Sequence, residues 1–254
     1  MLRILPVDLS WDKNNKDRML FFIFASNMKK IVLFNGSPRK EGNSAAMASA
    51  FCKGATATGS EPVVFSTSSL RLHDCRGCLR CNILKHCVME DDDWKNLHHL
   101  ILQAQILVFA MPVYFHHVPA SMKRLIDRFR CFHHVRITEN SLIHTPFHPW
   151  KKEIVLLMSM GSPSASEAQP IIQLFEFMCT VLGKENRLHV ITATRLVTPG
   201  QLHYDETSLR RLYQRLELPL HLVPIDYRRN QEILQQCYEL GKNIVATQEN
   251  PTDL

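Results

Sequence analysis

The stretch Ile31–Ser44 reads IVLFNGSPRKEGNS and decides the fold of the chain. It begins with a short apolar run, typical of a strand buried on both faces, and continues into a loop that carries glycine, serine and proline. A helix can begin at Asn43, where a segment rich in small residues starts. Such a loop at the carboxyl end of a first strand directs backbone N–H groups at one point, and the following helix adds its positive end. The stretch therefore predicts an anion site between a strand and a helix.

Apolar runs recur along the chain at intervals suited to alternating strands and helices. Further strands are predicted at 63–65, 106–110, 154–158 and 187–193, and helices at 43–57, 93–104, 119–129, 166–182 and 231–245. Continuous apolar runs indicate parallel strands covered on both faces, and the alternation with helices favours right-handed crossovers. The pattern predicts an α/β fold. The stretch Arg136–Trp150, rich in proline and histidine, is expected to be a surface excursion.

The composition indicates one globular domain. The chain has 254 residues, of which 45% are apolar and 21% charged, and its net charge of +6 is spread without a long basic block. No apolar run reaches the ~18–20 residues that cross a bilayer. We therefore expect no nucleic-acid or membrane partner. Residues 1–27 are expected to be a poorly ordered extension, because nothing in them pairs with a recognisable motif and their apolar run lacks the basic leader of a signal peptide; 28–248 are expected to form the domain and 249–254 a tail.

The loop after the first strand suits a phosphate monoester. Ser37, Asn43 and Ser44 can donate hydrogen bonds, and Arg39 supplies a positive charge. The loop lacks the Lys-Ser/Thr of a Walker A motif and the G-x-G-x-x-G of a dinucleotide site. The alternative interpretation is an ordinary turn between a strand and a helix.

A second segment, Pro112–Phe115 (PVYF), follows the third predicted strand. In an open α/β sheet this is the switch point, where ligands lie outside the carboxyl ends of the strands. The segment would place backbone and an aromatic ring beside a planar ligand. The alternative is that Tyr114 and Phe115 are core aromatics.

The motifs G-S-P-R-x-x-G-N-S from Gly36, P-V-Y from Pro112 and V-P-A-x-x-K-x-x-I-D-R from Val118 carry a resemblance. They resemble the iron–sulfur flavoprotein and NADPH-dependent FMN reductase group of the flavodoxin-like superfamily. The resemblance implies a three-layer sandwich around a five-stranded parallel sheet in the order 2-1-3-4-5, and a homodimer or homotetramer. It also implies FMN, with its phosphate and its ring held by two sets of residues: Ser37, Arg39, Asn43 and Ser44 for the phosphate; Pro112, Val113, Tyr114, Phe115, Met160 and Gly161 for the isoalloxazine.

A cluster of cysteines has the spacing C-x2-C-x2-C-x5-C, formed by Cys75, Cys78, Cys81 and Cys87. This spacing suits a [4Fe–4S] cluster, and clustered cysteines indicate a reducing compartment, so we expect a cytoplasmic protein. Structural zinc and no metal at all are the alternatives. Nearby basic residues would offset an anionic cluster and dock an acidic carrier: Arg76, Arg80, Lys85 and His86. Lys123 and Arg128 are expected on a solvated helix face.

These features together predict an FMN-binding oxidoreductase. The flavin would carry the chemistry, so no side chain is assigned a catalytic role. Electrons would enter from ferredoxin or a similar acidic carrier through the cluster, reach FMN, and leave to a small acceptor. One alternative is an NAD(P)H-dependent FMN or quinone reductase without a cluster, and another is a redox sensor.

Overall fold

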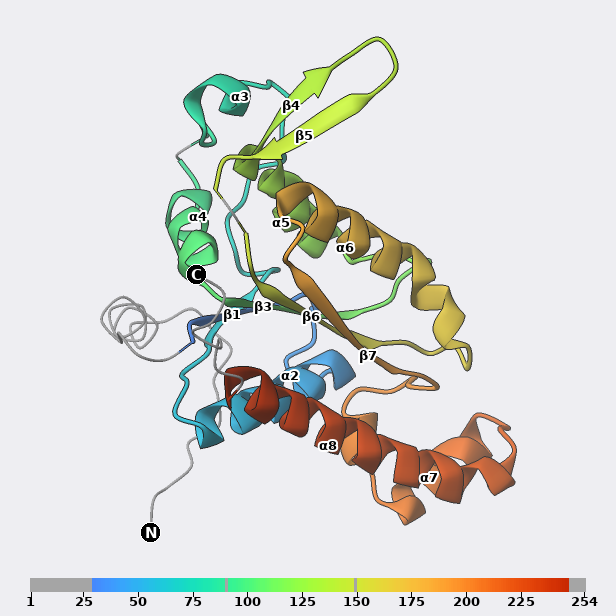
Figure 1. Cartoon of the computed structure of the whole chain (residues 1–254). Coiled ribbons are helices and arrows are strands. Elements are labelled where there is room, and N and C mark those ends of the chain that lie inside the picture. The colour runs from blue at the N-terminus through green and yellow to red at the C-terminus, as the bar shows by residue number, and fades with distance from the viewer. Residues whose placement is uncertain (1–28, 90, 149, 247–254) are drawn as a thin grey trace.

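A five-stranded parallel sheet forms the centre of the molecule (Figure 1). The computed structural model describes residues 29–89, 91–148 and 150–246, so the expected extension 1–27 and tail 249–254 lie outside the described residues. The sheet has the order β2-β1-β3-β6-β7 and all its pairs are parallel. Its strands are β1 (Ile31–Asn35), β2 (Val63–Ser66), β3 (Ile106–Pro112), β6 (Glu153–Ser159) and β7 (Arg187–Ala193). The carboxyl ends of these strands therefore meet at one edge of the sheet.

The central strands are buried on both faces, as their continuous apolar runs predict. In β1, Ile31 and Leu33 belong to one hydrophobic core, while Val32 and Phe34 belong to the other. One core lies under α2 (Asn43–Ala57) and α8 (Val223–Ala246) (Figure 1). The other lies under the remaining layer: α4 (Trp94–Gln103), α5 (Ala120–Arg128) and α6 (Gln169–Leu182). This arrangement is the three-layer sandwich that the resemblance implies.

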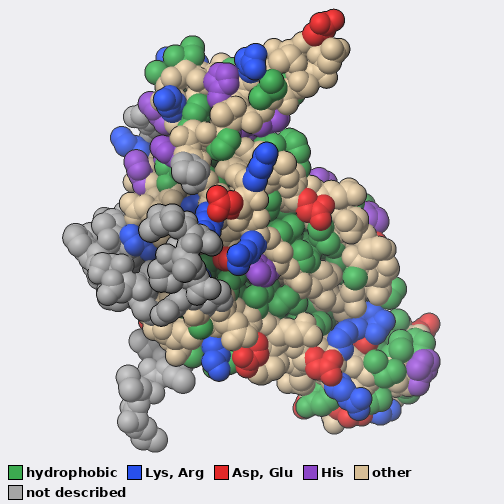
Figure 2. All heavy atoms as spheres, in the orientation of Figure 1, with side chains coloured by type: hydrophobic (Ala, Val, Ile, Leu, Met, Phe, Trp, Pro, Cys, Tyr) green, Lys and Arg blue, Asp and Glu red, His purple; other side chains and the backbone are tan. Residues whose placement is uncertain are grey.

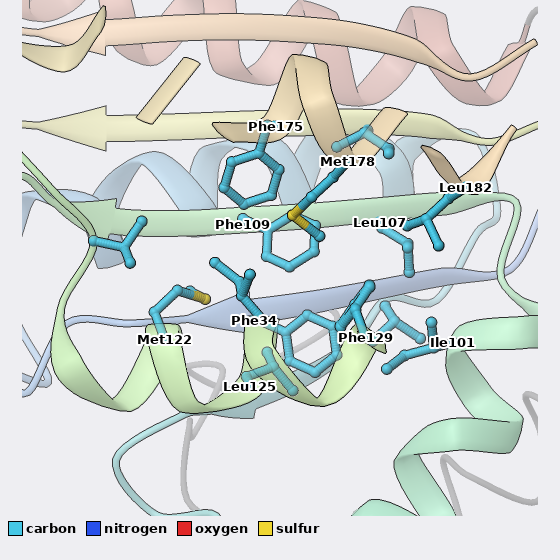
Figure 3. Close-up of a cluster of buried hydrophobic side chains, with 14 of the residues drawn as sticks. Phe34, Ile101, Leu107, Phe109, Met122, Leu125, Phe129, Phe175, Met178 and Leu182 are labelled. Atoms are coloured by element: carbon cyan, nitrogen blue, oxygen red, sulfur yellow. The ribbon is translucent and has the colours of Figure 1, made fainter. Parts of the chain in front are cut away.

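Aromatic side chains fill the core under α4, α5 and α6 (Figure 3). The ring of Phe109 packs edge-on against Phe175, with 4.8 Å between ring centroids, and contacts Phe34 at 5.6 Å. Phe129 from the end of α5 closes the cluster at 6.1 Å from Phe109. Edge-to-face packing of this kind adds to the stabilisation that comes from buried area alone.

Two glycines let α2 and α8 cross in direct contact. A Cβ atom on Gly54 would lie 1.9 Å from the carbonyl oxygen of Tyr238, and one on Gly241 would lie 2.1 Å from that of Phe51. Any larger residue at either position would push the helices apart. The C-terminal helix is thereby fixed on the helix that begins at the predicted phosphate loop.

Several elements were not expected from the sequence. The predicted excursion Arg136–Trp150 is wrong in part, because β4 (His133–Ile137) and β5 (Leu142–Pro146) form an antiparallel hairpin and Trp150 is buried. In sequence, the hairpin comes between the third and fourth strands of the sheet. The observed strand order is therefore 2-1-3-6-7, and the expected order 2-1-3-4-5 is not matched exactly. The other additions are α3 (Cys81–Leu84), α7 (Glu206–Arg215) and short 3₁₀ turns at Phe129–Phe132, Ala165–Ala168, Gln201–His203 and Leu220–Leu222. Within the described ranges, no helix has the length and apolar character to cross a bilayer.

Candidate functional site

The loop between β1 and α2 is folded by its own hydrogen bonds. The Gly36 N–H donates to the carbonyl of Ala110 at 2.7 Å, which ties the loop to β3. The Ser37 N–H donates to Asn35 Oδ1 at 3.0 Å, and the Arg39 N–H donates to Ser37 Oγ at 3.2 Å. Ser37 is buried and Arg39 is exposed. The loop therefore has a hydrogen-bonded backbone, with the positive side chains of Arg39 and Lys40 exposed at its rim.

The start of α2 offers unpartnered backbone donors at the carboxyl edge of the sheet. Gly42 is the N-cap, and no side chain in the described part of the chain caps the N–H groups of the first turn. A Cβ on Gly42 would lie 2.6 Å from Ser37 Oγ, so this position has no room for a capping side chain. The helix dipole places partial positive charge at the same point. Backbone N–H groups in this arrangement suit an anion such as a phosphate, and the role of Arg39 stays a prediction.

Asn43 and Ser44 use their side chains to hold the loop. Asn43 Nδ2 donates to the carbonyl of Thr198 at 2.9 Å, and Asn43 Oδ1 accepts from the Leu202 N–H at 3.2 Å. The hydroxyls of Ser44 and Ser159 lie 2.8 Å apart. Both side chains are buried. Their predicted contacts with a phosphate stay a prediction, and in this arrangement the contacts would come from their backbone N–H groups.

The segment after β3 forms a tight, strained turn. Tyr114 and His117 exchange two backbone hydrogen bonds of 3.0 and 2.9 Å, and the residues between them, Phe115 and His116, have φ of +49° and +61°. Bulky residues rarely adopt this left-handed conformation. When they do, the residue often lies at a ligand site. Tyr114 is 45% exposed and Phe115 is completely exposed, so neither is a core aromatic.

The three predicted segments meet at one edge of the sheet. The Val113 N–H donates to the carbonyl of Ser159 at 2.9 Å, next to the Ser159 hydroxyl that contacts Ser44. Met160 is buried and Gly161 is exposed at the rim. The loop after β1, the turn after β3 and the loop after β6 thus surround one region, as expected at the switch point of such a sheet.

A fourth segment, 194–202, was missed by the sequence analysis. It follows β7 and contacts both the Met160 loop and Asn43: the Leu196 N–H donates to the Met160 carbonyl at 2.9 Å. The turn residues Thr198-Pro-Gly were the available signal. Buried Asp226 of α8 anchors the segment by accepting from Arg195 Nε at 2.8 Å and from the Tyr213 hydroxyl. Burial alone would raise the pKa of Asp226, but these hydrogen bonds outweigh it and lower the pKa.

Three of the four clustered cysteines lie in the loop regions between β2 and α4, and Cys81 begins the short helix α3 beside the hairpin. Cys81 is buried, Cys78 is exposed, and Cys75 and Cys87 are intermediate. Burial raises the pKa of the Cys81 thiol. Figure 2 shows Lys, Arg and His side chains gathered on the surface around this part of the molecule. Among the described residues, no three His, Cys, Asp or Glu side chains lie close enough to hold a metal ion. The cysteines as placed therefore do not form a ready-made cluster site.

Arg128 is not on a solvated helix face, so this prediction is wrong. Its side chain is completely buried against that of Asp92, with 2.5 Å between Nη1 and Oδ2. Arg128 Nη2 also donates to Cys87 Sγ at 3.5 Å and to the carbonyl of Met89 at 3.2 Å. Burial alone would raise the pKa of Asp92, but the hydrogen bonds, first among them those of Arg128, lower it. Lys123 is half-exposed and pairs with Asp127 at 2.6 Å.

Comparisons with known proteins agree with this architecture. The family model of NADPH-dependent FMN reductases matches residues 29–192. An iron–sulfur flavoprotein of Archaeoglobus fulgidus is 36% identical over 41% of this chain and 47% of its own length. An iron–sulfur flavoprotein of Methanosarcina thermophila is 32% identical over 39% of this chain and 51% of its own length. The chain spans about half the length of the curated relatives it matches.

Solved structures show the same fold at low sequence identity. An NAD(P)H:quinone oxidoreductase from Methanothermobacter marburgensis superposes with a TM-score of 0.55 at 16% identity, covering 86% of this chain and 100% of that protein. An azoreductase from Bacillus anthracis gives a TM-score of 0.56 at 12% identity, covering 85% of this chain and 100% of that protein. The fold is therefore flavodoxin-like, as the resemblance implied. Because the family match extends over most of the sheet and its site loops, the chain belongs to the NADPH-dependent FMN reductase family.

Proposed function

We propose that the chain binds FMN at the carboxyl edge of its sheet and works as a flavin-dependent oxidoreductase. The observation that carries this proposal is that three segments meet at the carboxyl edge of the sheet beside the uncapped start of α2: the loop after β1, Val113 just before the turn Tyr114–His117, and the loop at Ser159 and Met160. Membership of the FMN reductase family supports the same cofactor.

The chain's own residues would bind and orient the flavin. The first-turn N–H groups of α2 and the side chain of Arg39 would hold the phosphate, while the turn Tyr114–His117 and Gly161 would border the ring. Bound FMN would supply the redox chemistry, accepting electrons from NAD(P)H and passing them to a small acceptor such as a quinone. Solvent would supply the protons that the acceptor takes up with these electrons, so no side chain is assigned an acid–base role.

The experiment for this proposal is reconstitution with FMN followed by anaerobic stopped-flow mixing with NADPH. We expect stoichiometric binding of FMN and rapid bleaching of its visible absorbance. Protein that binds no FMN would contradict the proposal. Binding without bleaching by NADPH or NADH would reject the nicotinamide donor and favour electron entry from another carrier.

A second candidate adds a [4Fe–4S] cluster on Cys75, Cys78, Cys81 and Cys87 as the entry point for electrons. Two arginines support it, because Arg128 Nη2 lies 3.5 Å from Cys87 Sγ and Arg130 Nη1 lies 3.7 Å from Cys81 Sγ. Such N–H groups stabilise anionic sulfur. The matched relatives are named iron–sulfur flavoproteins. Binding would require the cysteine loop to gather its sulfur atoms.

The cluster candidate implies an acidic protein donor of the ferredoxin type, docked on the basic surface near the cysteine loop. Iron and acid-labile sulfide analysis of protein purified without air tests it. We expect about four of each per chain if the cluster forms, the stoichiometry of this cluster type. Flavin-replete protein without iron would reject it. Light scattering of the same sample tests the proposed homodimer or homotetramer.

A further inference from the structure

The side-chain amide of Asn43 joins the start of α2 to a distant part of the chain. Its nitrogen donates to the Thr198 carbonyl at 2.9 Å, and its oxygen accepts from the Leu202 N–H at 3.2 Å. Both ends of the amide are therefore held by the segment 198–202. The direction of the first-turn N–H groups depends on how that segment is fixed.

Gln201 fixes the segment from inside the protein. It is completely buried, and its Oε1 accepts from the N–H groups of Val197 and Thr198 at 2.9 and 3.2 Å. Its Nε2 donates to the Arg195 carbonyl at 2.8 Å. One side chain thus sets the backbone from Arg195 to Thr198, including the residue whose carbonyl holds Asn43.

Two residues of helix α8 hold the segment that contains Gln201. Asn230, completely buried, donates to the Gln201 carbonyl at 3.5 Å, and Asp226 holds Arg195 through two hydrogen bonds of 2.8 and 2.5 Å. The glycine crossing at Gly54 and Gly241 fixes α8 on α2. Arg195, Gln201, Asp226 and Asn230 all lie beyond residue 192, where the family match ends.

We propose that Gln201 is a positioning residue for the phosphate of the flavin. It acts through the Thr198 carbonyl on the amide of Asn43, and so on the first-turn N–H groups of α2. This inference rests on the proposed binding of FMN. It assigns the affinity for the phosphate in part to a buried residue that does not itself contact the ligand.

The test compares FMN with riboflavin, which has the same ring system and lacks the phosphate. Flavin fluorescence is titrated with the cofactor-free protein, and dissociation constants are measured for the wild type, Gln201→Met and Asn186→Ala. Asn186 is the matched control, because its amide also bridges backbone groups, donating to the Cys179 and Gly183 carbonyls and accepting from the Lys152 N–H, at the opposite edge of the sheet.

We expect Gln201→Met to weaken FMN binding about tenfold, because several hydrogen bonds that fix the segment are lost. Riboflavin binding should stay within about twofold, since no phosphate is involved. Asn186→Ala should leave the ratio of the two constants unchanged. If Gln201→Met does not fold, Gln201→Asn replaces it: the shorter amide keeps one donor and one acceptor but displaces both by a methylene group, so we expect a smaller loss with the same selectivity for FMN.

Two outcomes would overturn the inference in different ways. Equal weakening of FMN and riboflavin by the Gln201 variants, or no change in either, would refute the positioning role while the proposed function stands. A wild type that binds both flavins equally well would refute the phosphate site itself, and the inference with it.

Discussion

Replacing Asp92 by Asn should destabilise the protein strongly, because it removes the counter-ion of a buried guanidinium. The side chains of Arg128 and Asp92 are 0% and 1% exposed. Asp92 also accepts from the His73 N–H at 2.9 Å and the Trp94 N–H at 2.9 Å. Removing one partner of a buried ion pair costs about 3–5 kcal/mol. Since a domain of this kind has about 5–15 kcal/mol of total stability, the loss is a large part of it.

Urea unfolding followed by circular dichroism at pH 7 measures this loss. Asp127→Asn is the control, because its pair with Lys123 is 43–44% exposed and should contribute less than about 1 kcal/mol. The double variant Asp92→Leu/Arg128→Met should recover only part of the loss, since apolar side chains replace the buried pair but leave the His73 and Trp94 N–H groups without their acceptor. A cost below about 1 kcal/mol for Asp92→Asn would refute the reasoning.

The same pair predicts a dependence on pH with a definite sign. The pKa of Asp92 is lower in the folded than in the unfolded chain. Its stabilisation is therefore complete above the unfolded value of about 3.9 and is lost as pH falls through the lower folded value. The difference in unfolding free energy between wild type and Asp92→Asn should shrink in acid. A difference that grows below about pH 4 would contradict this assignment.

Three further changes test other parts of the structure. Gly42→Ala should weaken FMN binding about tenfold in a fluorescence titration, because its Cβ would lie 2.6 Å from Ser37 Oγ. An unchanged affinity would mean that the loop backbone can move to accept the new Cβ without loss of binding. Phe115→Asn should raise the unfolding free energy by about 1 kcal/mol in urea, since Asn tolerates a positive φ; a decrease would show that the exposed ring is covered in solution. Burial lowers the pKa of Lys152 from 10.5 to about 8. Between these pH values, Lys152 is neutral in the folded chain and still charged in the unfolded chain. Stability should therefore rise there by up to roughly 3 kcal/mol relative to Lys152→Met, and parallel pH profiles would refute this.

The sequence predicted the elements whose signals are local. The strand Ile31–Asn35 and the helix Asn43–Ala57 were expected within one residue of their observed bounds, because an apolar run and a turn-rich loop mark them directly. The hairpin was missed since His133 and His144 interrupt the apolar alternation that indicates a strand.

The unpredicted parts of the site depend on partners far away in the sequence. Arg128 is charged, and charged side chains are usually found on the surface. Its burial is explained by its contact with Asp92, 36 positions earlier. Asn43 was expected to face a ligand, yet its amide is held by a segment 155 positions away. Gln201 has no sequence signal for its role, because most of its partners are backbone atoms that any residue supplies.

The measurement that tests the central claim most directly is a crystal structure of the protein with FMN bound. We predict that the phosphate lies within about 3 Å of the first-turn N–H groups of α2, with the Arg39 side chain turned toward it and the ring bordered by the turn Tyr114–His117. A phosphate bound elsewhere, for example against the basic residues of the cysteine loop, would contradict the account.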